Sequence, residues 1–87
     1  MSATVPENLD RDLADQSVTM KVRVALRENE KTRDIAKSLK VGTCKRCVYV
    51  QGQVSSQELK DAITDVAIRA DGVNRVVNLV EVKTQSI

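Results

Sequence analysis

Apolar and polar residues alternate with a period of two along residues 39–54, the pattern of β-strands that bury one face. The positions that share the buried face are Leu39, Val41, Thr43, Val48, Val50 and Val54. Lys45 and Arg46 separate two such runs, which predicts a hairpin with a two-residue turn. The predicted register pairs Cys44 with Cys47, Thr43 with Val48, Gly42 with Tyr49 and Val41 with Val50. The turn lacks the favoured Asn-Gly pair, so we expect backbone strain at Lys45 or Arg46.

A helical period of apolar residues precedes the hairpin. The apolar stripe of this first helix consists of Val18, Val22, Ala25 and Leu26. Asp15 stands just ahead of the stripe, and we expect its carboxylate to be the N-cap. Met20 and Val24 lie off the stripe. They form a second apolar patch, which would either meet a partner or pack beneath the N-terminal segment.

A second helix and a last strand follow the hairpin. The apolar stripe of the helix consists of Leu59, Ala62, Ile63, Val66, Ala67 and Ala70. Ser55 and Glu58 have the spacing of a capping box, and Gly72 is expected to end the helix. Residues 73–83 predict a strand with apolar positions on both faces, in which Asn78 bonds to backbone at a strand end.

The remaining segments define the limits of the domain. Residues 1–14 are a polar, acidic lead-in, residues 15–83 form one α+β domain, and residues 84–87 are a tail. Residues 27–38 are interpreted as the end of the first helix and a loop, with Ile35 as its core anchor. A chain of 87 residues allows one domain of this kind.

Composition argues against catalysis. The chain has no histidine, which excludes imidazole acid–base chemistry and histidine metal ligands. No paired-carboxylate site, nucleophile–base pair or glycine-rich phosphate loop is visible. Tyr49 is the single aromatic residue, so a nucleic-acid partner that stacks its bases is not expected. We therefore expect a protein that is not an enzyme.

Positive charge is concentrated in the middle of the chain, although the net charge is only +2. Residues 21–46 contain nine lysines and arginines against three acidic residues. Such a stretch could attract phosphates or anionic lipid. An ordinary solvated surface of mixed charge is the alternative.

Cys44 and Cys47 flank the predicted turn. Four interpretations remain open: a reversible disulfide, a redox site, half of a zinc site or two unpaired thiols. Zinc would need four cysteines from two copies of the chain, and no other cofactor is expected.

No apolar run reaches transmembrane length, and the first residues do not form a signal peptide. If Met1 is the native start, we expect a cytoplasmic protein, free or at the periphery of a membrane. A natural chain that begins further upstream would allow a periplasmic location.

The stretch 15–82 resembles the BON domain, a module named for bacterial osmotic-shock and nodulation proteins. The matching positions are Val18, Val22, Ala25, Leu26, Leu39, Val41, Val48, Val50, Gly52, Val54, Ala62, Val66, Ala67, Gly72, Val73, Val76, Asn78, Val80 and Val82. The resemblance implies an α-β-β-α-β order, with two helices on one face of a three-stranded mixed sheet. It also implies a non-catalytic module, mostly envelope- or membrane-associated, linked to phospholipid binding, protein assembly or potassium sensing. The chain departs from the family at the turn, where Lys45-Arg46 replaces the usual Asn-Gly or Asp-Gly.

With the helices on one face, the other face of the sheet becomes the candidate binding surface. Its expected contact residues are Tyr49, Val77, Leu79, Lys40, Lys45 and Arg46. Alternatively, the lead-in covers this face itself through Leu9 and Leu13. The main hypothesis is a binding module for a membrane-linked protein assembly or an anionic phospholipid, with self-association as a further option. The competing hypothesis is a redox- or zinc-responsive assembly switch at Cys44 and Cys47. Small-cation binding is a third idea, for which the sequence identifies no oxygen ligands.

Overall fold

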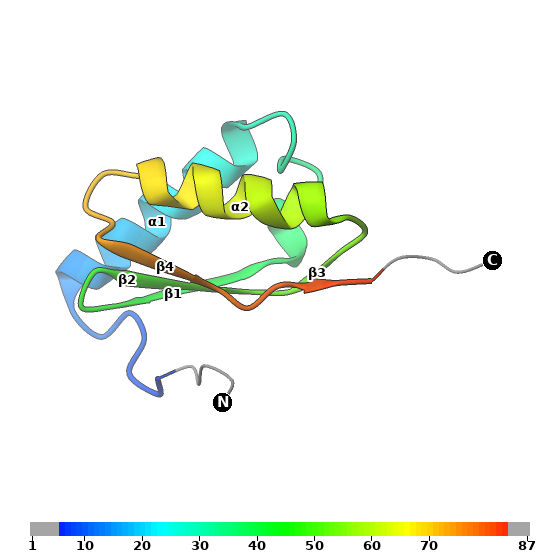
Figure 1. The fold of residues 1–87 in the computed structure, drawn as a ribbon. Coiled ribbons are helices and arrows are strands. Elements are labelled where there is room, and N and C mark those ends of the chain that lie inside the picture. Colours follow the sequence, from blue (N-terminus) through cyan, green and yellow to red (C-terminus); the bar gives the residue numbers. More distant parts are fainter. Residues whose placement is uncertain (1–5, 84–87) are drawn as a thin grey trace.

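Two helices lie side by side on one face of a β-sheet (Figure 1). The structure, a computed structural model, describes residues 6–83, so the predicted tail 84–87 and the first five residues of the lead-in lie outside the described residues. The elements are α1 (Leu13–Glu28), η1 (Ala36–Ser38), β1 (Lys40–Cys44), β2 (Cys47–Gln51), β3 (Gln53–Val54), α2 (Gln57–Arg69), β4 (Arg75–Asn78) and β5 (Glu81–Val82). The α+β class, the α-β-β-α-β order and the three-stranded mixed sheet are confirmed.

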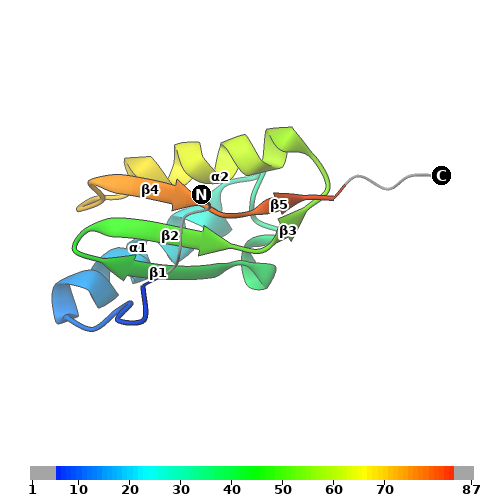
Figure 2. The same cartoon turned by 60° about the horizontal axis from the view of Figure 1, so that its bottom comes forward.

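The main sheet has the order β1-β2-β4, antiparallel between β1 and β2 and parallel between β2 and β4. The hairpin register is confirmed at every predicted pair, from Val41 with Val50 to Cys44 with Cys47. Beyond the main sheet, β3 and β5 continue as a short parallel pair (Figure 2). The expected second and last strands are thus each interrupted. Gly52 marks the first break, where an added Cβ would lie 2.7 Å from Leu39 Cδ2.

The core fills the space between the helices and the inner face of the sheet. Its buried apolar residues are Val18, Val22, Leu26, Leu39, Val41, Val48, Val50, Val54, Ile63, Val66, Ala67 and Val80. Alternation along the strands therefore identified the inward residues correctly. The first-helix stripe also holds, except that Ala25 is only partly buried.

The start of α1 corrects the prediction for Asp15. The helix begins at Leu13, and Asp12 occupies the N-cap position without a side-chain capping bond. Asp15 is instead buried, and its carboxylate accepts hydrogen bonds from the backbone N–H groups of Lys45 (3.1 Å) and Arg46 (3.3 Å). The acid that was expected to cap a helix holds the hairpin turn, because the fold brings the turn against the start of α1.

The capping box at Ser55 is also wrong, by one residue. Ser56 is the N-cap of α2, and its hydroxyl accepts a hydrogen bond from the N–H of Leu59 at 3.2 Å. Glu58 then stands too early to complete the box and instead forms an ion pair with Lys31 at 3.8 Å. At the other end, α2 stops at Arg69, and Gly72 follows with the positive φ of 91° that favours glycine.

Two polar side chains form hydrogen bonds at the ends of β4 and α1. Asn78 donates to the carbonyl of Lys60 (2.8 Å) and to the Thr64 hydroxyl (2.7 Å), and its Oδ1 accepts from the N–H of Val80 (3.0 Å). The expected structural role of Asn78 is therefore confirmed. Thr32, which the sequence did not single out, is fully buried in the loop after α1 and donates to the carbonyl of Leu26.

Candidate functional site

The face of the sheet that the helices leave open is the candidate site (Figure 1). We call it the outer face and define it by the strand positions that alternate with the buried valines. These positions are Lys40, Gly42 and Cys44 of β1, Cys47, Tyr49 and Gln51 of β2, and Arg75 and Val77 of β4, followed by Leu79. Three of them, Gly42, Tyr49 and Val77, are direct neighbours across the strands.

The expected apolar anchors lie on this face but are less open than predicted. Tyr49, Val77 and Leu79 are each partly buried, whereas Val77 and Leu79 were expected to be exposed unless covered. Tyr49 and Val77 are register partners, and the N–H of Leu79 donates to the carbonyl of Val50 at 2.8 Å. The register therefore brings Tyr49 next to Val77 and continues the apolar strip to Leu79.

Basic side chains surround these anchors. Lys40 lies at the start of β1 and Lys45 and Arg46 at the hairpin turn, all three exposed. Arg75 is a fourth, exposed residue, aligned with Cys47. The sequence analysis did not predict Arg75 as a contact residue. It stands two positions before Val77 on the same strand, and this spacing places both side chains on the same face.

The turn holds two of these basic residues in an unusual backbone conformation. Lys45 has φ = 50° and Arg46 has φ = 65°, the left-handed values of a type I′ turn. Neither residue is glycine, so each conformation is strained. The two hydrogen bonds to the Asp15 carboxylate help to stabilise the turn.

The lead-in covers part of the outer face, which answers the question left open by the sequence. Asp10 exchanges two hydrogen bonds with the backbone of Thr43: its N–H donates to the carbonyl at 2.7 Å, and its Oδ1 accepts from the N–H at 3.0 Å. The hydroxyl of Thr19 donates to the same Oδ1 and lies 2.7 Å from the Thr43 hydroxyl. Asp10 thereby ties the lead-in to both α1 and the free edge of β1.

Leu9 rests on the outer face itself. A Cβ added at Gly42 would lie 2.6 Å from Leu9 Cδ1, so glycine makes room for the leucine. Leu13, the other residue expected to cover the face, is instead 82% exposed on α1. Coverage therefore extends over β1 near Gly42 and is provided by Leu9 rather than Leu13.

The two cysteines are aligned with each other across the turn. Cys44 and Cys47 are both free thiols and partly buried. Directly opposed residues in antiparallel strands have Cα atoms about 4.5–5.5 Å apart, which is within the range that a disulfide spans. Cys44 Sγ also lies 3.6 Å from Asn8 Oδ1. Among residues 6–83, no group of three or more histidine, cysteine or acidic side chains could hold a metal ion.

Cys47 also affects Tyr49. A hydrogen bond with the thiol, together with partial burial, raises the pKa of the Tyr49 phenol above its ordinary value. The outer face thus presents the Tyr49 phenol as a hydrogen-bonding group beside the cysteines.

The second apolar patch of the first helix is open to solvent. Met20 is 67% and Val24 45% exposed, and they line a shallow pocket with Ser17, Lys21, Ala25 and Glu28. The described part of the lead-in does not cover this patch, since it runs along β1 instead. The patch is thus a second exposed apolar surface, on α1 rather than on the sheet.

A family model described as the BON domain matches residues 14–84. A comparison with curated protein sequences finds no significant match. Within the part of the chain that the structure describes, no helix combines the length and the apolar character needed to cross a bilayer.

Proposed function

This chain belongs to the BON domain family, a family of non-catalytic binding domains, and we propose on that premise that it binds an anionic surface through its outer face. The surface would be the phospholipid of a membrane or an acidic part of a membrane-linked protein assembly. Tyr49, Val77 and Leu79 would make the apolar contacts. Lys40, Lys45, Arg46 and Arg75 would supply the positive charge.

One observation carries this proposal: the outer face combines an apolar strip with four basic residues, and no helix within residues 6–83 covers it. An apolar strip rimmed by charge is typical of an interaction surface. Each lysine or arginine near an anionic bilayer contributes about 1 kcal/mol of binding free energy. The positive rim would therefore draw the face to an anionic surface, and the apolar strip would make the close contact.

The strained turn supports the same interpretation. Asn-Gly would adopt the left-handed turn without strain, yet this chain has Lys45 and Arg46 there. Strain that persists in a folded protein is often retained for function. Here the function would be to present two positive charges at the tip of the outer face.

The experiment compares two matched substitutions in a vesicle co-sedimentation assay. Leu79→Asp places a negative charge on the outer face, and Ile68→Asp places the same charge on α2, where Ile68 is 44% exposed. We expect Leu79→Asp to abolish binding to vesicles that contain phosphatidylglycerol and Ile68→Asp to leave it unchanged. Circular dichroism verifies that both variants are folded. Equal binding by both variants would overturn the proposal for the outer face.

A second variant removes charge without touching the apolar strip. Lys45→Gln/Arg46→Gln should weaken vesicle binding by about 2 kcal/mol, roughly thirtyfold, because two cations leave the rim. The wild-type chain could instead fail to bind anionic vesicles and co-purify with a protein assembly from native membranes. If Leu79→Asp abolishes that co-purification, the partner is the assembly.

A redox- or zinc-responsive switch is the second candidate, because the register sets Cys44 opposite Cys47 at the border of the outer face. Oxidation would join the two sulfurs into a disulfide within the hairpin, whereas zinc would join the cysteines of two copies. We expect vesicle binding or dimerisation to change with oxidant or zinc. A Cys44→Ser/Cys47→Ser variant that behaves as wild type under oxidant, zinc and chelator would remove this candidate.

A further inference from the structure

A small pocket lies between α1, η1 and the start of β1. Its volume is about 220 Å³. Four basic residues contribute to its lining: Arg23 and Arg27 from α1, Lys37 from η1 and Lys40 from β1. The other lining residues are Leu26, Ala36, Leu39 and Val41, so no acidic side chain contributes. The sequence showed these basic residues only as part of a charged stretch, and the fold gathers them around one site.

The charges around this pocket are not neutralised by ion pairs. The ion pairs among residues 6–83 join Lys21 to Asp71, Lys31 to Glu58 and Arg69 to Asp65, and none includes a basic residue of the pocket. Arg23 and Arg27 are also one helical turn apart, a spacing at which like charges destabilise a helix. An anion in the pocket would relieve this repulsion.

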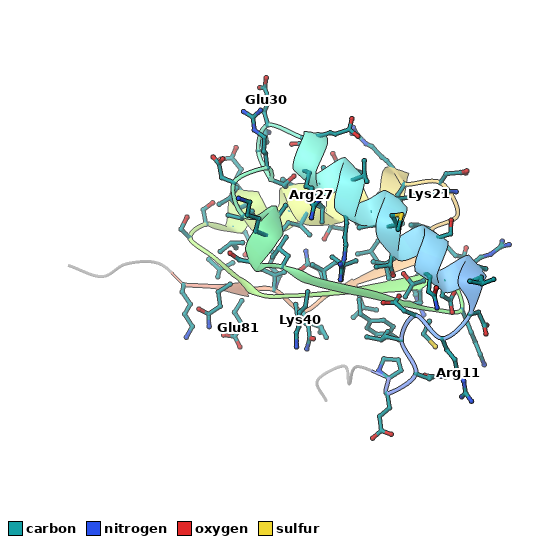
Figure 3. All side chains as sticks on the ribbon, turned by 180° about the vertical axis from the view of Figure 1, so that it is seen from behind. Arg11, Lys21, Arg27, Glu30, Lys40 and Glu81 are labelled. Atoms are coloured by element: carbon teal, nitrogen blue, oxygen red, sulfur yellow. The ribbon has the colours of Figure 1, made fainter. Side chains whose placement is uncertain are left out.

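The floor and the rim of the pocket have different character. Leu26, Leu39 and Val41 are each at most 8% exposed and provide an apolar floor. The Arg23 guanidinium extends toward β1, where it donates a long hydrogen bond of 3.5 Å to the carbonyl of Val41. Arg27 lies on the exposed side of α1, while Lys40 points away from the helix at the rim (Figure 3). Arg23, Arg27 and Lys37 are therefore the main candidates to contact a ligand, with Lys40 in a supporting place.

We propose that this pocket binds a phosphate group with more than one negative charge, either a phosphate monoester or a diphosphate. Guanidinium groups bind phosphate oxygens through paired N–H···O hydrogen bonds, and two arginines from one helix offer two such groups. Three cations match a multiply charged phosphate better than they match a single negative charge. The pocket is smaller than sites for drug-sized ligands and has room for about seven waters, which suits a phosphate or diphosphate group.

The direct experiment is a titration of the ¹⁵N-labelled chain with inorganic pyrophosphate at constant ionic strength, followed by NMR. We expect saturable shifts confined to the amides of residues 23–27 and 36–41 and to the arginine side-chain N–H groups. Because the ligand binds the folded state alone, it should also raise the melting temperature with concentration. Weak, unsaturable shifts at basic residues throughout the chain would overturn the proposal.

Two charge-matched variants separate the pocket from general positive charge. Arg23→Gln/Arg27→Gln should weaken pyrophosphate binding at least about tenfold, because each arginine supplies charge-assisted hydrogen bonds. Arg33→Gln/Arg69→Gln removes the same charge from residues outside the pocket lining and should bind as wild type. Equal binding by the two double variants would contradict the proposal. Melting curves verify that both are folded.

The source of the phosphate is resolved by vesicles that contain phosphatidic acid, a lipid with a phosphomonoester headgroup. If the chain binds pyrophosphate but not these vesicles, and binding depends on Arg23 and Arg27, the natural ligand is a soluble phosphate compound. If pyrophosphate fails but phosphatidic acid vesicles bind with the same dependence, the ligand is a lipid headgroup. If neither depends on these arginines, the site is refuted. Leu79→Asp should keep its affinity for pyrophosphate, so this test can succeed even if the outer face binds nothing.

Discussion

Successive residues of each strand point to opposite faces of the sheet, and the two faces differ in how much of the chain covers them. On the inner face, Val48 and Val50 are fully buried against the two helices. On the outer face, their strand neighbour Tyr49 is only partly buried, and a single segment of irregular chain reaches the face at Gly42. The inner face therefore provides stability through packing, whereas the outer face leaves apolar and basic groups available for contact.

The comparison shows where a small domain can carry function at little cost to its fold. A residue on the inner face touches the core, so its replacement lowers stability directly. A residue on the outer face contributes less to stability and can be chosen for what it binds. Stability and binding should consequently respond to different substitutions.

The largest expected effect comes from a matched pair of valines. Val50→Ala should lower the free energy of unfolding by about 2–3 kcal/mol, because it removes two buried methyl groups and leaves a cavity. Val77→Ala, on the outer face, should lower it by less than about 1 kcal/mol. Urea denaturation of both variants measures the difference. Equal losses would mean that the outer face is also packed as a core.

The acid beneath the hairpin turn should have the next largest effect. Asp15→Ala removes the acceptor for the N–H groups of Lys45 and Arg46. It should cost about 1.5–3 kcal/mol, the usual value for hydrogen bonds to a charged group. Asp12→Ala is the matched control, since Asp12 makes no side-chain capping bond and should cost little. If denaturation shows the reverse order, Asp15 does not hold the turn.

Replacing the turn should separate stability from binding. Lys45→Asn/Arg46→Gly relieves two strained left-handed conformations and should raise the free energy of unfolding by about 1–2 kcal/mol. The same variant loses two positive charges and should bind anionic vesicles more weakly. Denaturation and co-sedimentation measure the two effects independently. A variant that is less stable would show that the turn is not strained.

The smallest expected effect is a pH dependence at Tyr49. Its pKa is raised in the folded state, so the folded protein holds the phenolic proton more tightly than the unfolded chain does. This contribution is complete below about pH 10, the ordinary value for tyrosine, and is lost as the pH rises further. Tyr49→Phe should therefore flatten the decline of stability at alkaline pH. If the stability of Tyr49→Phe falls at alkaline pH as steeply as that of the wild type, other groups cause the loss.

Features set by local periodicity were predictable, and the hairpin is the best case. A period of two and a turn of two residues leave a single register that keeps the valines on one face, and that register is the one observed. Asn78 was predictable for a similar reason, because a polar residue at an inward position needs hydrogen-bond partners. These inferences required only neighbours along the chain or across one turn.

Features set by tertiary contact were missed. Asp15 stands near a helix start and suits an N-cap, but the hairpin turn offers its carboxylate two backbone N–H groups. The two adjacent serines before α2 differ too little in sequence to show which one caps the helix. The pocket proposed to bind phosphate joins residues from positions 23 to 41, and only the packing of α1, η1 and β1 brings them together. The covering by Leu9 likewise depends on the anchoring of Asp10 at the edge of β1.

The central claim is that the outer face, and not the exposed apolar patch of α1 at Met20 and Val24, makes contact with an anionic surface. NMR of the labelled chain with phosphatidylglycerol nanodiscs tests it most directly, because it reads every residue at once. We predict that broadening and shifts centre on Tyr49, Val77, Leu79 and the turn at Lys45 and Arg46. Perturbation centred on Met20 and Val24 of α1, with the outer face unchanged, would contradict the account.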